Sequence, residues 1–165
     1  MIFLYIICAM AIIYLQTSIQ APIERVFDLS RSIDLHKLST AKTNEQAIAG
    51  VTKGLISLNE TVTWQAKHLF KTRRFVTKIT KLEFPVFFED AMQQGDFKSF
   101  RHEHYFENMA NGTIMKDVLE FYSPFGWLGK MVDICFMKNY LQKFLMERNQ
   151  VIKEFAEGDG WRKVL

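Results

Sequence analysis

The feature that most constrains the fold is a change of hydrophobic period along the chain. Between Glu60 and Tyr122, apolar and polar side chains alternate in several runs, as in half-buried β-strands. Turn signals at 94–96 and 109–112 separate the later runs at hairpin spacing. The pattern predicts consecutive antiparallel strands at 60–68, 73–84, 87–93, 97–107 and 113–122.

A helical period replaces this alternation after Pro124 and Gly126. From Trp127 to Phe155, apolar residues recur at intervals of three and four, and Gly158 then provides a stop. We therefore predict one long amphipathic helix within 127–157. Its interior face is predicted to carry Met131, Ile134, Leu141, Phe144 or Leu145, and Ile152.

The N-terminal third predicts one strand and two short helices. An apolar strand is expected at 12–19, a helix starting near Pro22, and another at 33–38. The segment 39–58 is expected to form a loop and a short strand. The whole order predicts an α+β fold, in which a curved seven-stranded antiparallel sheet surrounds the C-terminal helix. Because such a sheet cannot touch the helix along its whole face, we expect a cavity between them.

Composition narrows the class of protein. The 165 residues suit one domain, and a net charge of +3 is too small to favour nucleic acid as a partner. Aromatic residues make up 14% of the chain, which favours a dense core or a cavity lined with rings. Cys8 and Cys135 form no disulfide framework, and the sequence predicts no cofactor.

The first 15 residues are almost wholly apolar but shorter than the roughly 20 residues that span a bilayer. They lack the positive charge that precedes the apolar region of a signal peptide. We interpret residues 1–9 as an apolar extension, with Met10 as the alternative start, residues 10–157 as the domain and 158–165 as a tail. A cytoplasmic protein without membrane contact is expected. The minor alternative is an anchor formed by residues 1–15.

Several short motifs stand out along the chain: Ile19-Gln20-Ala21-Pro22-Ile23-Glu24, Phe88-x-Asp90-x-Met92-x-x-Gly95-x-Phe97, His102-x-His104-x-Phe106, Gly112-Thr113-x-Met115-x-Asp117, Pro124-x-Gly126-x-Leu128-Gly129 and Glu147-Arg148-Asn149. Together they resemble the SRPBCC family, which includes START, Bet v 1-like and polyketide cyclase/dehydrase-like proteins. The chain looks most similar to bacterial members labelled "cell division inhibitor". The resemblance spans residues 12–157 and implies the helix-grip fold, whose members bind varied hydrophobic molecules and in some cases catalyse reactions.

Two histidines on one predicted strand are the main candidates for chemistry. His102 and His104 point to the same face, about 7 Å apart along the strand. Zinc would need a third ligand, for which His68, Asp117 or Glu60 are available. A structural hydrogen-bond network is favoured over catalysis and over a metal site. If the 109–112 segment is the hairpin loop, His104 lies opposite Asp117 and satisfies its buried carboxylate.

The predicted function is the binding of a small hydrophobic ligand, such as a lipid, a polyketide or an isoprenoid-like molecule. The alternatives are a cyclase or dehydrase using His102 or His104 with Asp117, and a regulatory protein of the cell-division-inhibitor-labelled group. The residues predicted to line the cavity are Trp64, His68, Phe75, Phe88, Asp90, Met92, Phe100, His102, His104, Phe106, Met115, Asp117, Leu119, Met131, Ile134 and Leu141.

Overall fold

The computed structural model describes residues 11–68, 71–124, 132 and 136–165. Its strands are β1 (Ala11–Ile19), β2 (Gln46–Gly50), β3 (Thr61–His68), β4 (Lys71–Glu83), β5 (Phe87–Gln94), β6 (Ser99–Met109) and β7 (Gly112–Tyr122). Its helices are α1 (Ile23–Ser30), α2 (Ile33–Ser39) and α4 (Lys138–Glu157), with 3₁₀ turns η1 (Ala41–Thr43) and η3 (Gly160–Lys163).

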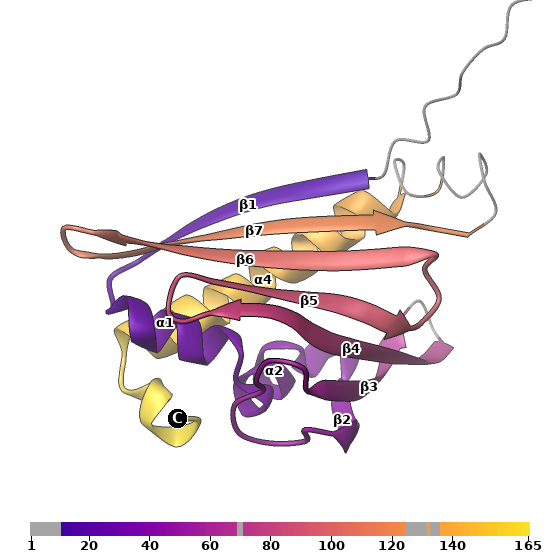
Figure 1. The fold of residues 1–165 in the computed structure, drawn as a ribbon, viewed down its shortest axis with the longest axis horizontal. Coiled ribbons are helices and arrows are strands. Elements are labelled where there is room, and N and C mark those ends of the chain that lie inside the picture. Colours follow the sequence, from indigo (N-terminus) through magenta and orange to yellow (C-terminus); the bar gives the residue numbers. More distant parts are fainter. Residues whose placement is uncertain (1–10, 69–70, 125–131, 133–135) are drawn as a thin grey trace, which may run out of the picture.

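All seven strands join one antiparallel sheet in the order β1-β7-β6-β5-β4-β3-β2. Figure 1 shows α4 running behind the sheet, with α1 and α2 beside it at the lower side of the view. The two short helices carry the chain from β1 at one sheet edge to β2 at the other. The predicted α+β architecture, with seven strands and two short helices after the first, is confirmed.

The register of the β6–β7 hairpin decides which side chains meet on the concave face. His104 lies opposite Asp117 and His102 opposite Leu119, so the predicted register is confirmed. The loop itself is shorter than predicted, because Met109 and Gly112 also pair and leave a two-residue turn. Removing one residue from each end of the loop adds a pair and leaves the register unchanged, which is why the faces still match.

One half of the sheet is closed by helices. Phe27 of α1 packs edge-on against Phe106, with ring centroids 5.2 Å apart. Ile152 of α4 belongs to the same buried cluster, which also contains Met115 of β7. Their side chains are removed from water, which is the main favourable contribution to folding.

The described part of α4 confirms part of the predicted interior face. Leu145 and Ile152 are buried, whereas Leu141 and Phe144 are half-buried. Met131 and Ile134 lie outside the described residues. The segment after α4, predicted as a tail, packs on the domain, because Trp161 contacts the main core and lies 4.4 Å from the Arg25 guanidinium.

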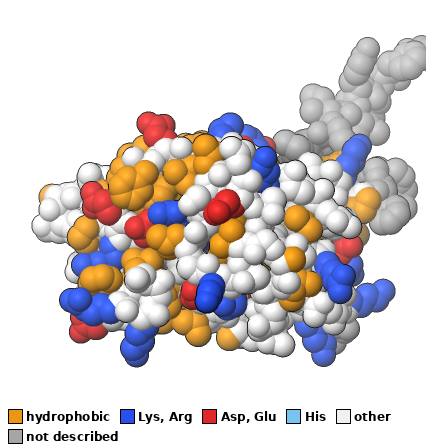
Figure 2. Space-filling model, turned by 60° about the horizontal axis from the view of Figure 1, so that its bottom comes forward, with side chains coloured by type: hydrophobic (Ala, Val, Ile, Leu, Met, Phe, Trp, Pro, Cys, Tyr) orange, Lys and Arg blue, Asp and Glu red, His pale blue; other side chains and the backbone are white. Residues whose placement is uncertain are grey.

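The predicted start at Met10 and the extension 1–9 lie outside the described residues. No helix in the described ranges combines the length and the apolar character needed to cross a bilayer. Figure 2 shows one face of the molecule, on which Lys and Arg side chains are interspersed with Asp, Glu and hydrophobic side chains.

Candidate ligand-binding site

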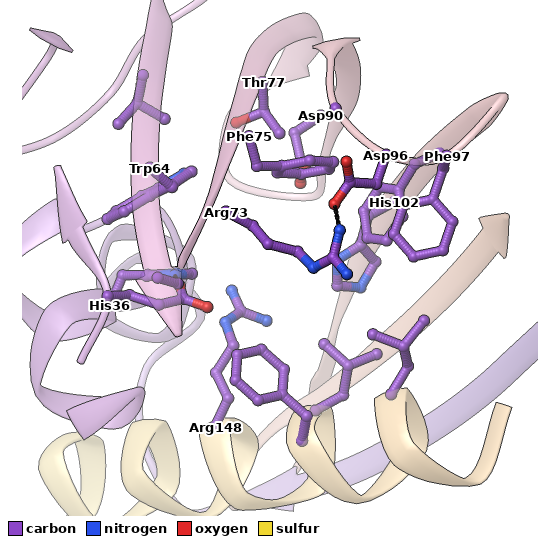
Figure 3. A pocket seen from close by; sticks show the side chains of 18 of the residues that line it. His36, Trp64, Arg73, Phe75, Thr77, Asp90, Asp96, Phe97, His102 and Arg148 are labelled. Carbon is purple, nitrogen blue, oxygen red and sulfur yellow. Dashed lines mark hydrogen bonds and ion pairs between the residues drawn. The ribbon is translucent and has the colours of Figure 1, made fainter. Parts of the chain in front are cut away.

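A cavity of about 1070 Å³ separates α4 from the middle of the sheet. Strands β3 to β6 form one wall, and α2 and the first half of α4 form the other (Figure 3). The sequence analysis expected a cavity in this place, between the curved sheet and the C-terminal helix. Its lining is mostly apolar and aromatic, including Ile33, Ile56, Val62, Trp64, Ala66, Phe75, Ile79, Phe88, Phe97, Phe100, Leu141 and Phe144.

The structure brings half of the residues named from the sequence to this cavity. Those that line it are Trp64, Phe75, Phe88, Asp90, Phe100, His102, His104 and Leu141. His68 lies on β3, and its side chain is outside the described part of the structure, as are Met131 and Ile134.

Five other named residues do not line the cavity, which corrects the sequence-based list. Phe106, Met115 and Leu119 point to the concave face but lie under α1 and α4, with at most 2% of each exposed. Asp117 is covered in the same way and contacts the cavity histidines from behind. Met92 lies on β5 beside Phe75 and Gly95 without reaching the cavity. Strand alternation identified the face of these residues, whereas the helices decide which part of that face stays open.

The polar end of the cavity is built on three adjacent strands. Asp90 on β5, His102 and His104 on β6, and Asp117 on β7 meet on the concave face. Nε2 of His104 lies 3.2 Å from Oδ2 of Asp90, and Nε2 of His102 lies 3.0 Å from Oδ1 of Asp117. Nδ1 of His104 is only 2.9 Å from the same Oδ1 of Asp117, but outside hydrogen-bonding geometry. That contact is therefore electrostatic.

Helix α4 completes this cluster from the other side. Asn149 donates from Nδ2 to Oδ2 of Asp117 at 2.7 Å. Arg148 donates from Nη2 to the carbonyl of Ser30 at 3.0 Å, where α1 ends and its last carbonyls lack helical partners. Nη1 of Arg148 lies 3.6 Å from Oδ1 of Asp117, and no hydrogen bond satisfies it among the described residues. Figure 3 shows this guanidinium pointing into the cavity.

Burial sets the charge of the cluster. Burial, together with the neighbouring His104, lowers the pKa of His102 to about 4, although Asp117 and Asp90 act in the opposite direction. The imidazole of His102 is therefore neutral at pH 7. Burial alone would raise the pKa of Asp117, but its contacts with both imidazoles hold it well below the usual range. Burial likewise opposes ionisation of Asp90, but the hydrogen bond with His104 and the nearby His102 and Arg148 lower its pKa.

A second polar pair lies on the opposite wall of the cavity and was missed by the sequence analysis. Nε2 of His36 on α2 lies 2.6 Å from Oε2 of Glu45. The His36 ring stacks on Trp64, with centroids 4.1 Å apart. His36 stands one helical turn after Ile33, which also lines the cavity, so helical spacing was the only available signal.

Comparison with known proteins identifies the fold. No family model matches the chain, and no curated protein matches its sequence significantly. Solved structures do match: TTHA0849 from Thermus thermophilus has a TM-score of 0.71 at 16% identity, over 87% of this chain and 95% of that chain. A START superfamily protein from Mycobacterium smegmatis has a TM-score of 0.68 at 13% identity, over 90% and 98% of the two chains. The chain has the START and Bet v 1-like helix-grip fold.

A third solved structure with this fold that matches the chain is the ginseng major latex-like protein 151 from Panax ginseng. Its TM-score is 0.67 at 12% identity, over 90% of this chain and 99% of that chain. At these identities the likeness shows the fold alone. The structures named here give no support to a cell-division role, so that label stays an expectation from the sequence resemblance.

An ion pair lies at the margin of the helix-grip cavity. Arg73 lines the cavity and pairs with Asp96, as Figure 3 shows. The two residues are 23 positions apart on β4 and on the β5–β6 turn, so only the sheet brings them together.

Proposed function

We propose that this protein binds a small hydrophobic molecule in the cavity between the sheet and α4. The observation that carries the proposal is the cavity itself, about 1070 Å³ in volume and lined mainly by aromatic and aliphatic side chains. This volume is slightly above the roughly 300–1,000 Å³ of ordinary ligand pockets. It suits a molecule of lipid, polyketide or isoprenoid type, whose transfer from water to such a lining is favourable.

The polar groups of the cavity would orient that molecule rather than hold it. His102 and Asp90 reach the cavity from the sheet, and Arg148 reaches it from α4. A hydroxyl or carbonyl group at one end of an otherwise apolar ligand would find both donors and acceptors there. The rest of the lining would accept the hydrocarbon part. A bacterial, cytoplasmic setting is part of this proposal, and nucleic acid is not proposed as a partner.

Filling the cavity tests the proposal directly. Ala66 lines the cavity on β3, so Ala66→Phe would occupy part of its volume. Gln65→Phe, one residue earlier, places the same ring on the outer face of β3 and serves as the matched control. We expect Ala66→Phe to weaken binding of the apolar dye 1-anilinonaphthalene-8-sulfonate at least about tenfold, a difference of about 1.4 kcal/mol. Native mass spectrometry should also show less co-purified ligand. Equal dye binding by the two variants would contradict the proposal.

An enzyme of cyclase or dehydrase type is the second candidate. It is favoured by one observation: His102 and His104 line the cavity, while Asp117 contacts a nitrogen of each from behind. An imidazole oriented by a carboxylate is a typical general acid or base. If the protein is a catalyst, wild type should change the mass of a bound β-hydroxy ketone by loss of water. His102→Gln should bind that compound without changing it. Unchanged mass with wild type would leave binding as the function.

A further inference from the structure

We propose that Asp90, His102 and His104 form a binding site for a divalent transition-metal cation on the cavity wall. One ligand atom from each of these residues lies within 4.8 Å of the other two. Two imidazoles and one carboxylate are a donor set that zinc and ferrous iron use in proteins. This site goes beyond hydrophobic binding, because it does not depend on the ligand that occupies the cavity.

The spacing of the best-defined pair fits coordination. Ligands about 2.1 Å from a metal, at tetrahedral or octahedral angles, lie about 3.0–3.4 Å from one another. Nε2 of His104 and Oδ2 of Asp90 are 3.2 Å apart. A cation between them would replace one hydrogen bond of ordinary length, and the ligand atom of His102 lies within 4.8 Å of both. From the sequence, His68, Asp117 or Glu60 were the candidates for a third ligand, whereas the structure places Asp90 of the neighbouring strand there.

A carboxylate already stands behind both imidazoles. Asp117 Oδ1 lies 3.0 Å from Nε2 of His102 and 2.9 Å from Nδ1 of His104. Metal-bound histidines typically place the nitrogen that does not bind metal next to such a carboxylate, which orients the ring and raises its basicity. Asn149 in turn holds Asp117 by donating to Oδ2 at 2.7 Å. The carboxylate partner of His102 is therefore in place, whereas Nδ1 of His104 lies close to the same oxygen without hydrogen-bond geometry.

Charge and access also favour a cation at this position. Two acidic residues, Asp90 and Asp117, lie beside the two imidazoles. Nη1 of Arg148 lies 3.6 Å from Oδ1 of Asp117, so one positive charge offsets part of this acidic character. Asp90, His102 and His104 all line the cavity. A bound cation would thus keep an open coordination position toward whatever the cavity contains.

Titration with Zn²⁺ alone tests the site. The full chain, without a histidine tag and stripped with a chelator, should bind one Zn²⁺ by isothermal titration calorimetry. Co²⁺ should give the visible absorption bands of a low-coordinate nitrogen and oxygen site. Asp90→Asn removes the carboxylate but keeps a group that accepts from His104, so it should fold and yet bind Zn²⁺ at least about tenfold more weakly. That loss corresponds to about 1.4 kcal/mol.

The matched control is His36→Gln, which removes the other cavity histidine. It should leave the Zn²⁺ affinity within about twofold of wild type, since His36 lies on the opposite wall with Glu45. Circular dichroism should confirm that both variants are folded. Failure of wild type to bind Zn²⁺, equal binding by Asp90→Asn, or loss of binding in His36→Gln would each overturn the proposal. Dye binding by the same samples reports separately on the hydrophobic cavity.

Discussion

The two halves of the sheet share the same alternating pattern of apolar side chains, but one half forms closed core and the other lines the cavity. Around β1, β7 and β6, the inward side chains are covered by α1 and α4, and Phe106, Met115 and Leu119 are almost fully buried. Around β3, β4 and β5, inward rings such as Trp64 and Phe75 face the cavity instead. Both halves are apolar on the concave face. The two halves differ in whether helices cover that face. Contact with a helix, rather than the strand pattern, therefore decides whether an inward side chain is buried in the core or lines the cavity.

The largest expected contrast comes from shortening one leucine of the covered half of the sheet and one leucine of α4 that borders the cavity. Leu119→Ala should lower the free energy of unfolding by about 2–5 kcal/mol, because the close-packed surroundings cannot collapse into the space. Leu141→Ala should cost roughly 1 kcal/mol, because that half-buried side chain already borders an open cavity. Urea denaturation followed by circular dichroism measures both. Equal losses would mean that the cavity is as tightly filled as the core.

The pH dependence of the free energy of unfolding should reflect His102, which lies at the polar end of the cavity. The pKa of His102 falls from 6.5 to about 4 on folding, so the unfolded chain binds the extra proton between these values. Stability is then complete above about pH 6.5 and declines as the pH falls toward 4, by up to about 3 kcal/mol. Below that, protonation of Asp117 and Asp90, whose pKa values are lowered, should remove more.

Urea titrations at pH 7, 6 and 5 measure how the free energy of unfolding changes with pH in each variant. His102→Gln should flatten this dependence, whereas His36→Gln, in the same cavity, should leave it in place. An NMR titration in which His102 is protonated at pH 6 would contradict the assignment.

The smallest expected contrast concerns one glycine in each half. Gly112 has a φ of +147°, and a Cβ there would lie 2.1 Å from the backbone oxygen of Ile19. Gly112→Ala should therefore cost about 1–3 kcal/mol through backbone strain. Gly95 lines the cavity, and its Cβ would meet the side-chain ends of Phe75 and Met92 at 2.6 and 2.8 Å. Because these side chains can turn, Gly95→Ala should cost under about 1 kcal/mol. A reversed order in thermal melts would show that the cavity wall is the stiffer half.

The sequence predicted those features that depend on local period. Strand alternation and turn position were enough to place His104 opposite Asp117, because a one-residue slip would have turned an apolar face to solvent. The sequence did not show that Asp90 would join His104, since that pairing depends on the β5–β6 register and no short turn fixed it. It also assigned Met115 and Leu119 to the cavity, because the path of a helix over a sheet is set by long-range packing. His36 and Glu45 meet through a loop whose course no pattern predicts.

The C-terminal half of α4 is anchored by hydrogen bonds to the end of β1, to the residue that follows it and to α1. Lys153 donates to the carbonyl of Ser18 at 2.7 Å. The carboxylate of Glu157 accepts from the amide of Gln20 at 2.8 Å, and the carbonyl of Ala156 accepts from Arg25 at 2.9 Å. The first seven residues of α4, 138–144, contribute no fully buried side chain and overlie the cavity. This end packs on the Leu119 cluster through half-buried side chains such as Leu141 and Phe144, so moving it would open fewer fully buried contacts than moving the other end. Under the binding proposed above, molecules of different width would therefore be accommodated by shifts of the first half of α4, while the second half keeps its position.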